Sequence, residues 1–136
     1  MKSVIFTSAI VLTMFFLPAC KKSESSSLTT AQKVQNKWQL VTDTENDHYS
    51  SLDHITTSYG NPTDYMDFRT DGKMYAQIGG YKDTLSYFLT GDTKITFSNS
   101  GGTFDIKTLT SNSFVLYGKE MGSGTNFIEE TITLKR

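Results

Sequence analysis

Two histidines, each directly after an aspartate, are the side chains in this sequence best suited to acid–base or metal chemistry. They are His48 and His54, in the pairs Asp47-His48 and Asp53-His54. The sequence has no further histidine and a single cysteine, so a zinc ion would need carboxylates such as Glu45 to complete its shell. We expect both histidines to be solvated side chains on the outer face of a helix, and we predict no metal site and no cofactor.

The serines and acids show no pattern of nucleophilic or acid–base catalysis. A serine nucleophile needs a base and an orienting acid, and the sequence has no Gly-x-Ser-x-Gly turn. Glu129 and Glu130 are adjacent, and adjacent side chains of a strand point to opposite faces, so they cannot flank one bond. Glu130 is two residues before Ile132, so in a regular strand both side chains would point to the same face. Glu130 is then either a buried polar anchor near Arg136 or is turned outward by a bulge. We favour the outward position, and we predict no catalytic residues and no enzyme.

The cysteine lies at the end of an apolar stretch. Lys2 precedes the uncharged residues 4–17, which would rise about 21 Å as a helix, short of a bilayer core of about 30 Å. This pattern is typical of a secretory signal peptide. Leu17-Pro18-Ala19-Cys20 resembles the lipobox of bacterial lipoproteins, which implies a diacylglyceryl group on the Cys20 thiol and cleavage before Cys20. The alternatives are an ordinary signal peptide with a free thiol, or a buried cysteine.

Lipidation at Cys20 predicts where the protein acts. Two acyl chains together hold a protein stably at a bilayer, so we expect the chain in the bacterial cell envelope, anchored to a membrane through Cys20. The serine-rich segment from Ser23 to Ser27 has the composition of a flexible linker. We therefore predict a signal peptide over 1–19, a lipid-anchored linker over 20–32 and one folded domain over 33–136.

The composition favours strands and argues against a nucleic-acid partner. The net charge is −1 and both signs are interspersed, without the basic patch that nucleic acids require. Aromatic residues make up 12% of the chain, and Pro62 is the one proline after the predicted signal peptide. Aromatic residues are enriched in strands and proline is excluded from strand interiors, so a sheet is expected.

Alternation of apolar and polar residues predicts strands over most of the domain. A short helix is expected before them, over 28–37. In the clearest hairpin, a three-residue loop over 70–72 sets Phe68 opposite Met74 and places the apolar side chains on one face. The predicted strands are 37–42, 64–69, 73–79, 84–90, 93–98, 103–109, 113–118 and 126–135.

One connection, residues 43–63, is much longer than the others. Tyr49, Leu52, Ile55 and Tyr59 recur in it at three- and four-residue spacing, which is typical of a one-sided helix. Long loops in compact domains are often lids or binding elements. We therefore expect these four residues to form a lid helix that ends at Gly60-Asn61-Pro62.

The domain resembles the lipocalin-like domains of small bacterial lipoproteins. The resemblance implies an all-β fold: an eight-stranded antiparallel up-and-down β-barrel, with Trp38 plugging one end and residues 43–63 across the other. A β-sandwich is the alternative, and pairing of strand 37–42 with strand 126–135 would exclude it. The resemblance rests on Asn36-Lys37-Trp38-Gln39-Leu40, on Phe68 before Asp71-Gly72-Lys73, and on Thr133-Leu134-Lys135-Arg136.

The barrel interior decides between two functions. We expect a membrane-anchored, non-enzymatic barrel that binds a small apolar ligand. The alternative is an interaction module with a solidly packed barrel, whose protein partner the sequence does not identify. A large cavity would favour the ligand and a packed interior would favour the partner. The aromatic residues that would line a cavity or form the core are Trp38, Phe68, Tyr87, Phe97, Phe104 and Phe114.

Overall fold

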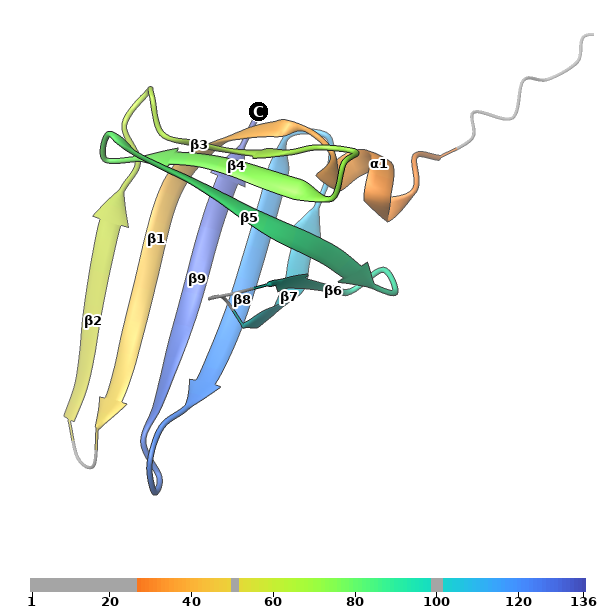
Figure 1. The fold of residues 1–136 in the computed structure, drawn as a ribbon. Helices are drawn as coiled ribbons and strands as arrows, with labels where there is room; N and C mark the ends of the chain where they lie inside the picture. The colour runs from red at the N-terminus through yellow and green to blue at the C-terminus, as the bar shows by residue number, and fades with distance from the viewer. Residues whose placement is uncertain (1–26, 50–51, 99–101) are drawn as a thin grey trace, which may run out of the picture.

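The computed structural model describes residues 27–49, 52–98 and 102–136, which form one short helix and nine antiparallel strands (Figure 1). The all-β prediction is therefore confirmed. The elements are α1 Thr30–Val34, β1 Lys37–Tyr49, β2 Leu52–Tyr59, β3 Tyr65–Phe68, β4 Lys73–Ile78, β5 Tyr81–Thr90, β6 Lys94–Phe97, β7 Thr103–Leu109, β8 Ser113–Met121 and β9 Phe127–Lys135.

Eight of the strands close into a barrel, and β2 lies outside it. The order is β2-β1-β3-β4-β5-β6-β7-β8-β9, and β1 also pairs with β9, which closes the sheet. The start of β1 pairs with β3, whereas its later part, Thr42–Tyr49, pairs with β2 along the same edge. The pairing of Leu40 with Leu134 is the contact that excludes a β-sandwich. All eight predicted strands are present, with ends within three residues of the prediction except that β1 continues seven residues past its predicted end, to Tyr49.

The predicted hairpin between β3 and β4 is confirmed residue by residue. Phe68 pairs with Met74 and Met66 with Ala76. The Arg69 amide donates to the Lys73 carbonyl at 2.9 Å, and Gly72 has a φ of 76°. That left-handed conformation is what a three-residue loop requires and what glycine adopts without strain.

The predicted lid helix is wrong, because Thr42–Tyr49 and Leu52–Tyr59 pair as the antiparallel strands β1 and β2. Tyr49, Ile55 and Tyr59 are strand residues, and Leu52 is the first residue of β2. A spacing of four residues is about one helical turn but also two full strand repeats, so Ile55 and Tyr59 share a face in either structure. The β-branched run from Ile55 to Thr57 favours the strand. Hydroxyl groups of Thr44 and Thr57 lie 3.2 Å apart across the pair.

The helix α1 closes one end of the barrel. Thr29 caps it: its hydroxyl accepts from the Gln32 amide at 3.3 Å, and its own amide donates to the Gln32 side chain at 2.9 Å. Val34, the last residue of α1, and Trp38 are fully buried, and the Trp38 indole N–H donates to the Val34 carbonyl at 3.0 Å. Trp38 thus fills this end of the barrel, as the resemblance implies. The helix begins within the range predicted as linker.

The barrel core next to α1 is packed with aromatic rings. The Phe68 ring lies 5.2 Å from that of Tyr87 and 5.7 Å from that of Phe114, and edge-on pairs at such distances are favourable. All six aromatic residues predicted as ligand-lining or core are buried: Trp38, Phe68, Tyr87, Phe97, Phe104 and Phe114. These rings form part of the barrel core, together with buried aliphatic residues such as Ile95, Leu116 and Leu134.

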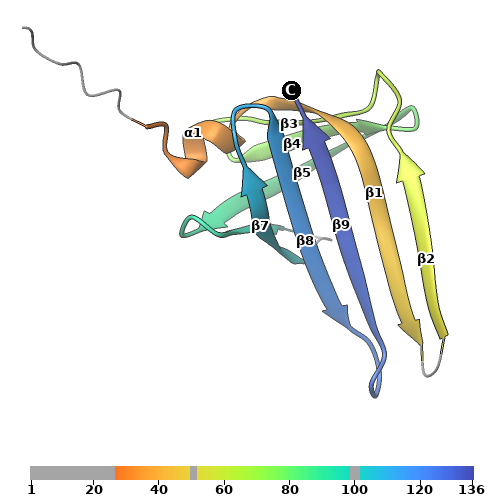
Figure 2. The same cartoon turned by 180° about the vertical axis from the view of Figure 1, so that it is seen from behind.

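The opposite end of the barrel is open on one side. The later parts of β1 and β8 and the first part of β9, together with β2, extend beyond β5 and β6 and form a wall that Figure 2 shows from behind. The inner face of this wall continues the inner face of the barrel. We call this end the open end and the end under α1 the closed end.

Candidate functional site

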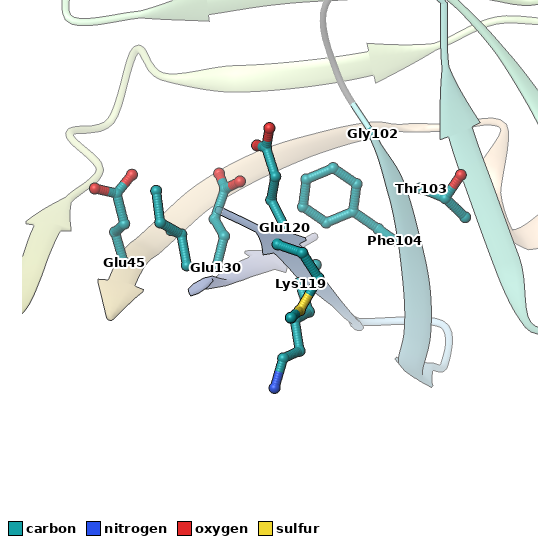
Figure 3. A pocket seen from close by; sticks show the side chains of 10 residues that line it. Glu45, Gly102, Thr103, Phe104, Lys119, Glu120 and Glu130 are labelled. Atoms are coloured by element: carbon teal, nitrogen blue, oxygen red, sulfur yellow. The ribbon is translucent and has the colours of Figure 1, made fainter. Parts of the chain in front are cut away.

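A cavity of about 420 Å³ lies at the open end, where the wall meets the start of β7. Figure 3 shows the Phe104 ring and three carboxylates directed to the same side, with Lys119 pointing away from them. The lining residues are Glu45, Gly102, Thr103, Phe104, Gly118, Lys119, Glu120, Met121, Ile128 and Glu130.

The register of β8 and β9 turns two of these carboxylates inward. The pairing runs unbroken from Ser113 opposite Lys135 to Met121 opposite Phe127. Glu130 therefore shares the inner face with the buried Ile132, and Glu120 lies on the same face of β8. The favoured outward position of Glu130 is wrong, because no bulge interrupts β9 in this pairing.

A bulge in β1 directs the third carboxylate inward. The pairing with β9 shifts between Leu40 and Thr42, which leaves Val41 as an extra residue. Before the bulge the even positions Trp38 and Leu40 are buried. After it the odd positions face inward, so Glu45 lies directly opposite Glu130. Asp43 and Asp47 lie on the same face.

Burial and like charges make Glu130 a weak acid. Burial raises its pKa, the charges of Asp43 and Glu45 raise it further, and the total brings the pKa to about 7. Burial also raises the pKa of Asp43, whose carboxyl group hydrogen-bonds with that of Glu130. The cavity wall therefore gains negative charge as the pH rises through neutrality.

Gly118 makes room for the aromatic floor of the cavity. It lies opposite Phe104 on β7, and a Cβ at position 118 would come within 2.8 Å of the Phe104 ring. A side chain there would push the ring into the cavity. The glycine is thus required by close packing and not by an unusual backbone conformation.

A second polar cluster lies on the outer face of the same wall. His48 stacks on Phe127 with ring centres 4.1 Å apart, and its ring nitrogens lie 2.8 Å from Asp53 and 3.1 Å from Glu129. The bond from the Tyr117 hydroxyl lowers the pKa of Glu129, with further contributions from His48 and Lys119. His48 is thus a paired, partly buried strand residue, and the expectation of a solvated helical side chain is wrong.

Sequence reasoning found few of the cavity residues. Of the aromatic set only Phe104 contacts the cavity. Cys20 lies outside the described residues. The missed acids had a signal: Asp43, Glu45 and Asp47 alternate with polar residues, and a strand would place all three on one face. That signal was hidden by the interpretation of 43–63 as a helical lid.

The closed end carries the opposite charge. A second hollow, of about 530 Å³, lies on the outer surface there, and its cations are Lys37, Lys135 and Arg136. The Lys37 ammonium lies 3.7 Å from the centre of the Tyr65 ring. In this hollow the buried Asp64 accepts from the amides of Asn61 and Gly79, both at 3.0 Å, and so ties two loops together.

Within the described ranges, no three His, Cys, Asp or Glu side chains are grouped so that they could hold a metal ion. The same ranges include no helix long and apolar enough to cross a membrane. Comparison with known proteins gives no significant match for this chain, whether to a family model, to a curated protein or to a solved structure.

Proposed function

We propose that this chain is a lipid-anchored binding protein of the bacterial envelope whose barrel holds a small molecule at its open end. The observation that supports this proposal is the cavity of about 420 Å³ between the wall and β7. Cavities of roughly 300–1,000 Å³ are typical of small-molecule sites. The role we assign to the cavity is binding, not catalysis.

The lining favours a ligand with an apolar body and a positive charge. Phe104, Met121 and Ile128 supply apolar surface, whereas Glu45, Glu120 and Glu130 supply carboxylates. The one cation in the lining, Lys119, points away and lies over the Phe127 ring at 3.5 Å. A purely apolar molecule would desolvate these carboxylates without pairing them, which costs free energy. We therefore propose an amphipathic cation in place of the purely apolar ligand expected from the sequence.

The anchor would place the cavity away from the membrane. The chain enters the barrel through α1 at the closed end (Figure 1), and the cavity lies at the open end. A lipid on Cys20 would therefore bring the closed end toward the bilayer. Lys37, Lys135 and Arg136 on that end complement anionic headgroups, each contributing about 1 kcal/mol near a charged surface.

The aromatic core supports a second candidate function. Five buried aromatic rings, those of Trp38, Phe68, Tyr87, Phe97 and Phe114, pack the barrel outside the cavity, which is the packed interior expected of an interaction module. In that case the barrel would present a surface to another protein and the open-end cavity would stay without a small-molecule ligand. Binding measurements separate the two functions.

Two amphiphiles with the same alkyl chain and opposite headgroup charge test whether the cavity prefers a cationic ligand. We expect dodecyltrimethylammonium to bind, as measured by isothermal titration calorimetry, and dodecyl sulfate to bind at least tenfold more weakly at pH 8, where Glu130 is charged. Glu130→Gln should weaken binding of the cation about tenfold, and the matched variant Glu129→Gln, on the outer face, should not. Equal binding of both probes, or of neither, would refute the cationic site.

The anchor is tested separately. Cys20→Ser should move the protein from the membrane fraction to the soluble fraction of the host. If the variant stays in the membrane fraction, lipidation at Cys20 is wrong, and the cavity proposal is unaffected. Native mass spectrometry of protein from its own host should show a retained small molecule, and a bare chain would favour the interaction module.

A further inference from the structure

Among the strands that the structure describes, β2 has a sheet neighbour on one side only. It stands at the end of the sheet order next to β1, and residues 53–59 are all exposed. The Gly60 amide donates to the Val41 carbonyl at 3.0 Å. Since donors alternate between the two sides of an antiparallel strand, the amides of His54, Thr56 and Ser58 face β1. The backbone groups of Asp53, Ile55, Thr57 and Tyr59 therefore point away from the sheet, and we call this row the β2 edge.

The β2 edge lacks the features by which edge strands avoid pairing. Natural edges are protected by proline, lysine, inward charges or bulges. Residues 53–59 include no proline and no lysine, and Asp53 is their one charged side chain at neutral pH apart from histidine. The pairing with β1 is unbroken from Thr42 opposite Tyr59 to Tyr49 opposite Leu52. The edge is therefore straight and open along its length.

We propose that the β2 edge pairs antiparallel with the β2 edge of a second copy of this chain. A twofold axis at Thr56 sets Ile55 opposite Thr57 of the second copy and Asp53 opposite its Tyr59. This register joins all four outward-pointing residues of each copy in hydrogen-bonded pairs. Each odd-numbered residue of β2 lies opposite an odd-numbered residue of the second copy, so side chains of the same face meet. The inner faces of the two sheets therefore become continuous, as do the outer faces.

The side chains fit this register. Ile55 lies diagonally across from Ile55 and Tyr59 of the second copy, within reach for apolar contact. Ile55 is 65% and Tyr59 80% exposed in the single chain, so both would gain burial. The two Asp53 carboxylates lie at opposite ends of the paired segment, about 20 Å apart at about 3.4 Å per residue, so they do not repel strongly. The strand is thus complementary to itself.

The dimer is expected to be weak in solution. Pairing of one edge buries less than the roughly 1,200 Å² of a stable interface. Tethering both copies to one membrane raises their effective concentration without new contacts. The pairing does not depend on the small-molecule cavity, whose test has a different readout.

Disulfide trapping in the full chain tests the register. Thr56→Cys places two thiols at the twofold axis, in a non-hydrogen-bonded pair about 4.5 Å apart at Cα, which a disulfide can bridge. With a mild copper oxidant, this variant should give several-fold more covalent dimer than the wild-type chain. The matched variant Ser58→Cys, on the same face, should give little, because its thiols would lie about 14 Å apart.

A proline distinguishes edge pairing from random collision. Thr57→Pro removes an amide that points to solvent, so the barrel should keep its melting temperature while the Thr56→Cys dimer yield falls several-fold. Thr56→Pro removes an amide that hydrogen-bonds to β1, so this control variant should lower the melting temperature of the barrel. Equal trapping of Thr56→Cys and Ser58→Cys, or a yield that Thr57→Pro leaves unchanged, would overturn the self-pairing and leave the β2 edge for an extended segment of another protein.

Discussion

Glu130 couples the charge of the cavity to pH. Its pKa is raised to about 7 in the folded chain, mainly by burial and then by Asp43 and Glu45, against 4.5 when unfolded. A raised pKa means that the folded state holds its proton more tightly. The stabilisation is therefore complete below about pH 4.5 and is lost as the pH rises through about 7. The raised pKa of Asp43 acts in the same direction.

The first prediction concerns the slope of stability against pH. The melting temperature of the wild-type chain should fall between pH 5 and pH 8, and Glu130→Gln should flatten that fall. Asp105→Asn is the control, since Lys94 and Lys107 lower the pKa of that partly exposed carboxyl and its titration lies below this range. Calorimetry at fixed ionic strength measures the slope, and an unchanged slope in Glu130→Gln would contradict the assignment.

The second prediction concerns the contact of Gly118 with Phe104. Gly118→Val should destabilise the barrel by about 1–3 kcal/mol, because overpacking forces a neighbour to move. The neighbour is the Phe104 ring, 2.8 Å from the added Cβ. Phe104→Leu should relieve this clash, so the double variant should lose less stability than the two single variants together. Urea unfolding of all four chains measures the coupling, and simple additivity would contradict it.

Among the elements, α1 is short and depends on its cap. The third prediction is that Thr29→Ala costs about 1 kcal/mol, because it removes the hydroxyl that accepts from the Gln32 amide. For a domain of this size that lowers the melting temperature by about 4–8 °C. Thr30→Ala should cost little, since alanine is the better helix former. Equal losses in both variants would show that the cap does not support the closed end.

The sequence predicts elements well where local pattern decides them. The register of β3 and β4 follows from one apolar face and one left-handed glycine. The later part of β1 was missed because its inner face is polar: Asp43, Glu45 and Asp47 carry no hydrophobic alternation to mark a strand. Their inward direction also depends on the bulge at Val41, which is set by pairing with β9 and by no nearby residue.

At the scale of the molecule, the acids of the wall are gathered on one surface. The inward positions of β1, β2, β8 and β9 include five acids and no lysine or arginine, as the register and the sequence together show. Glu45 and Glu130 are directly opposite, a pairing that is unfavourable for like charges. The carboxylates of the folded chain therefore repel one another at the site where we propose that a cation binds. The five are Asp43, Glu45, Asp47, Glu120 and Glu130.

The fourth prediction follows from this repulsion. Raising NaCl from 10 to 100 mM shortens the screening length from about 30 to about 10 Å, and at pH 8 this should raise the melting temperature by a few degrees. At pH 5, where Glu130 is protonated, the gain should be smaller. The double variant Glu45→Gln/Glu130→Gln should lose most of the gain at pH 8, while Asp105→Asn should keep it. A gain of equal size at both pH values would mean that general ionic effects, and not the facing carboxylates of the wall, set the salt dependence.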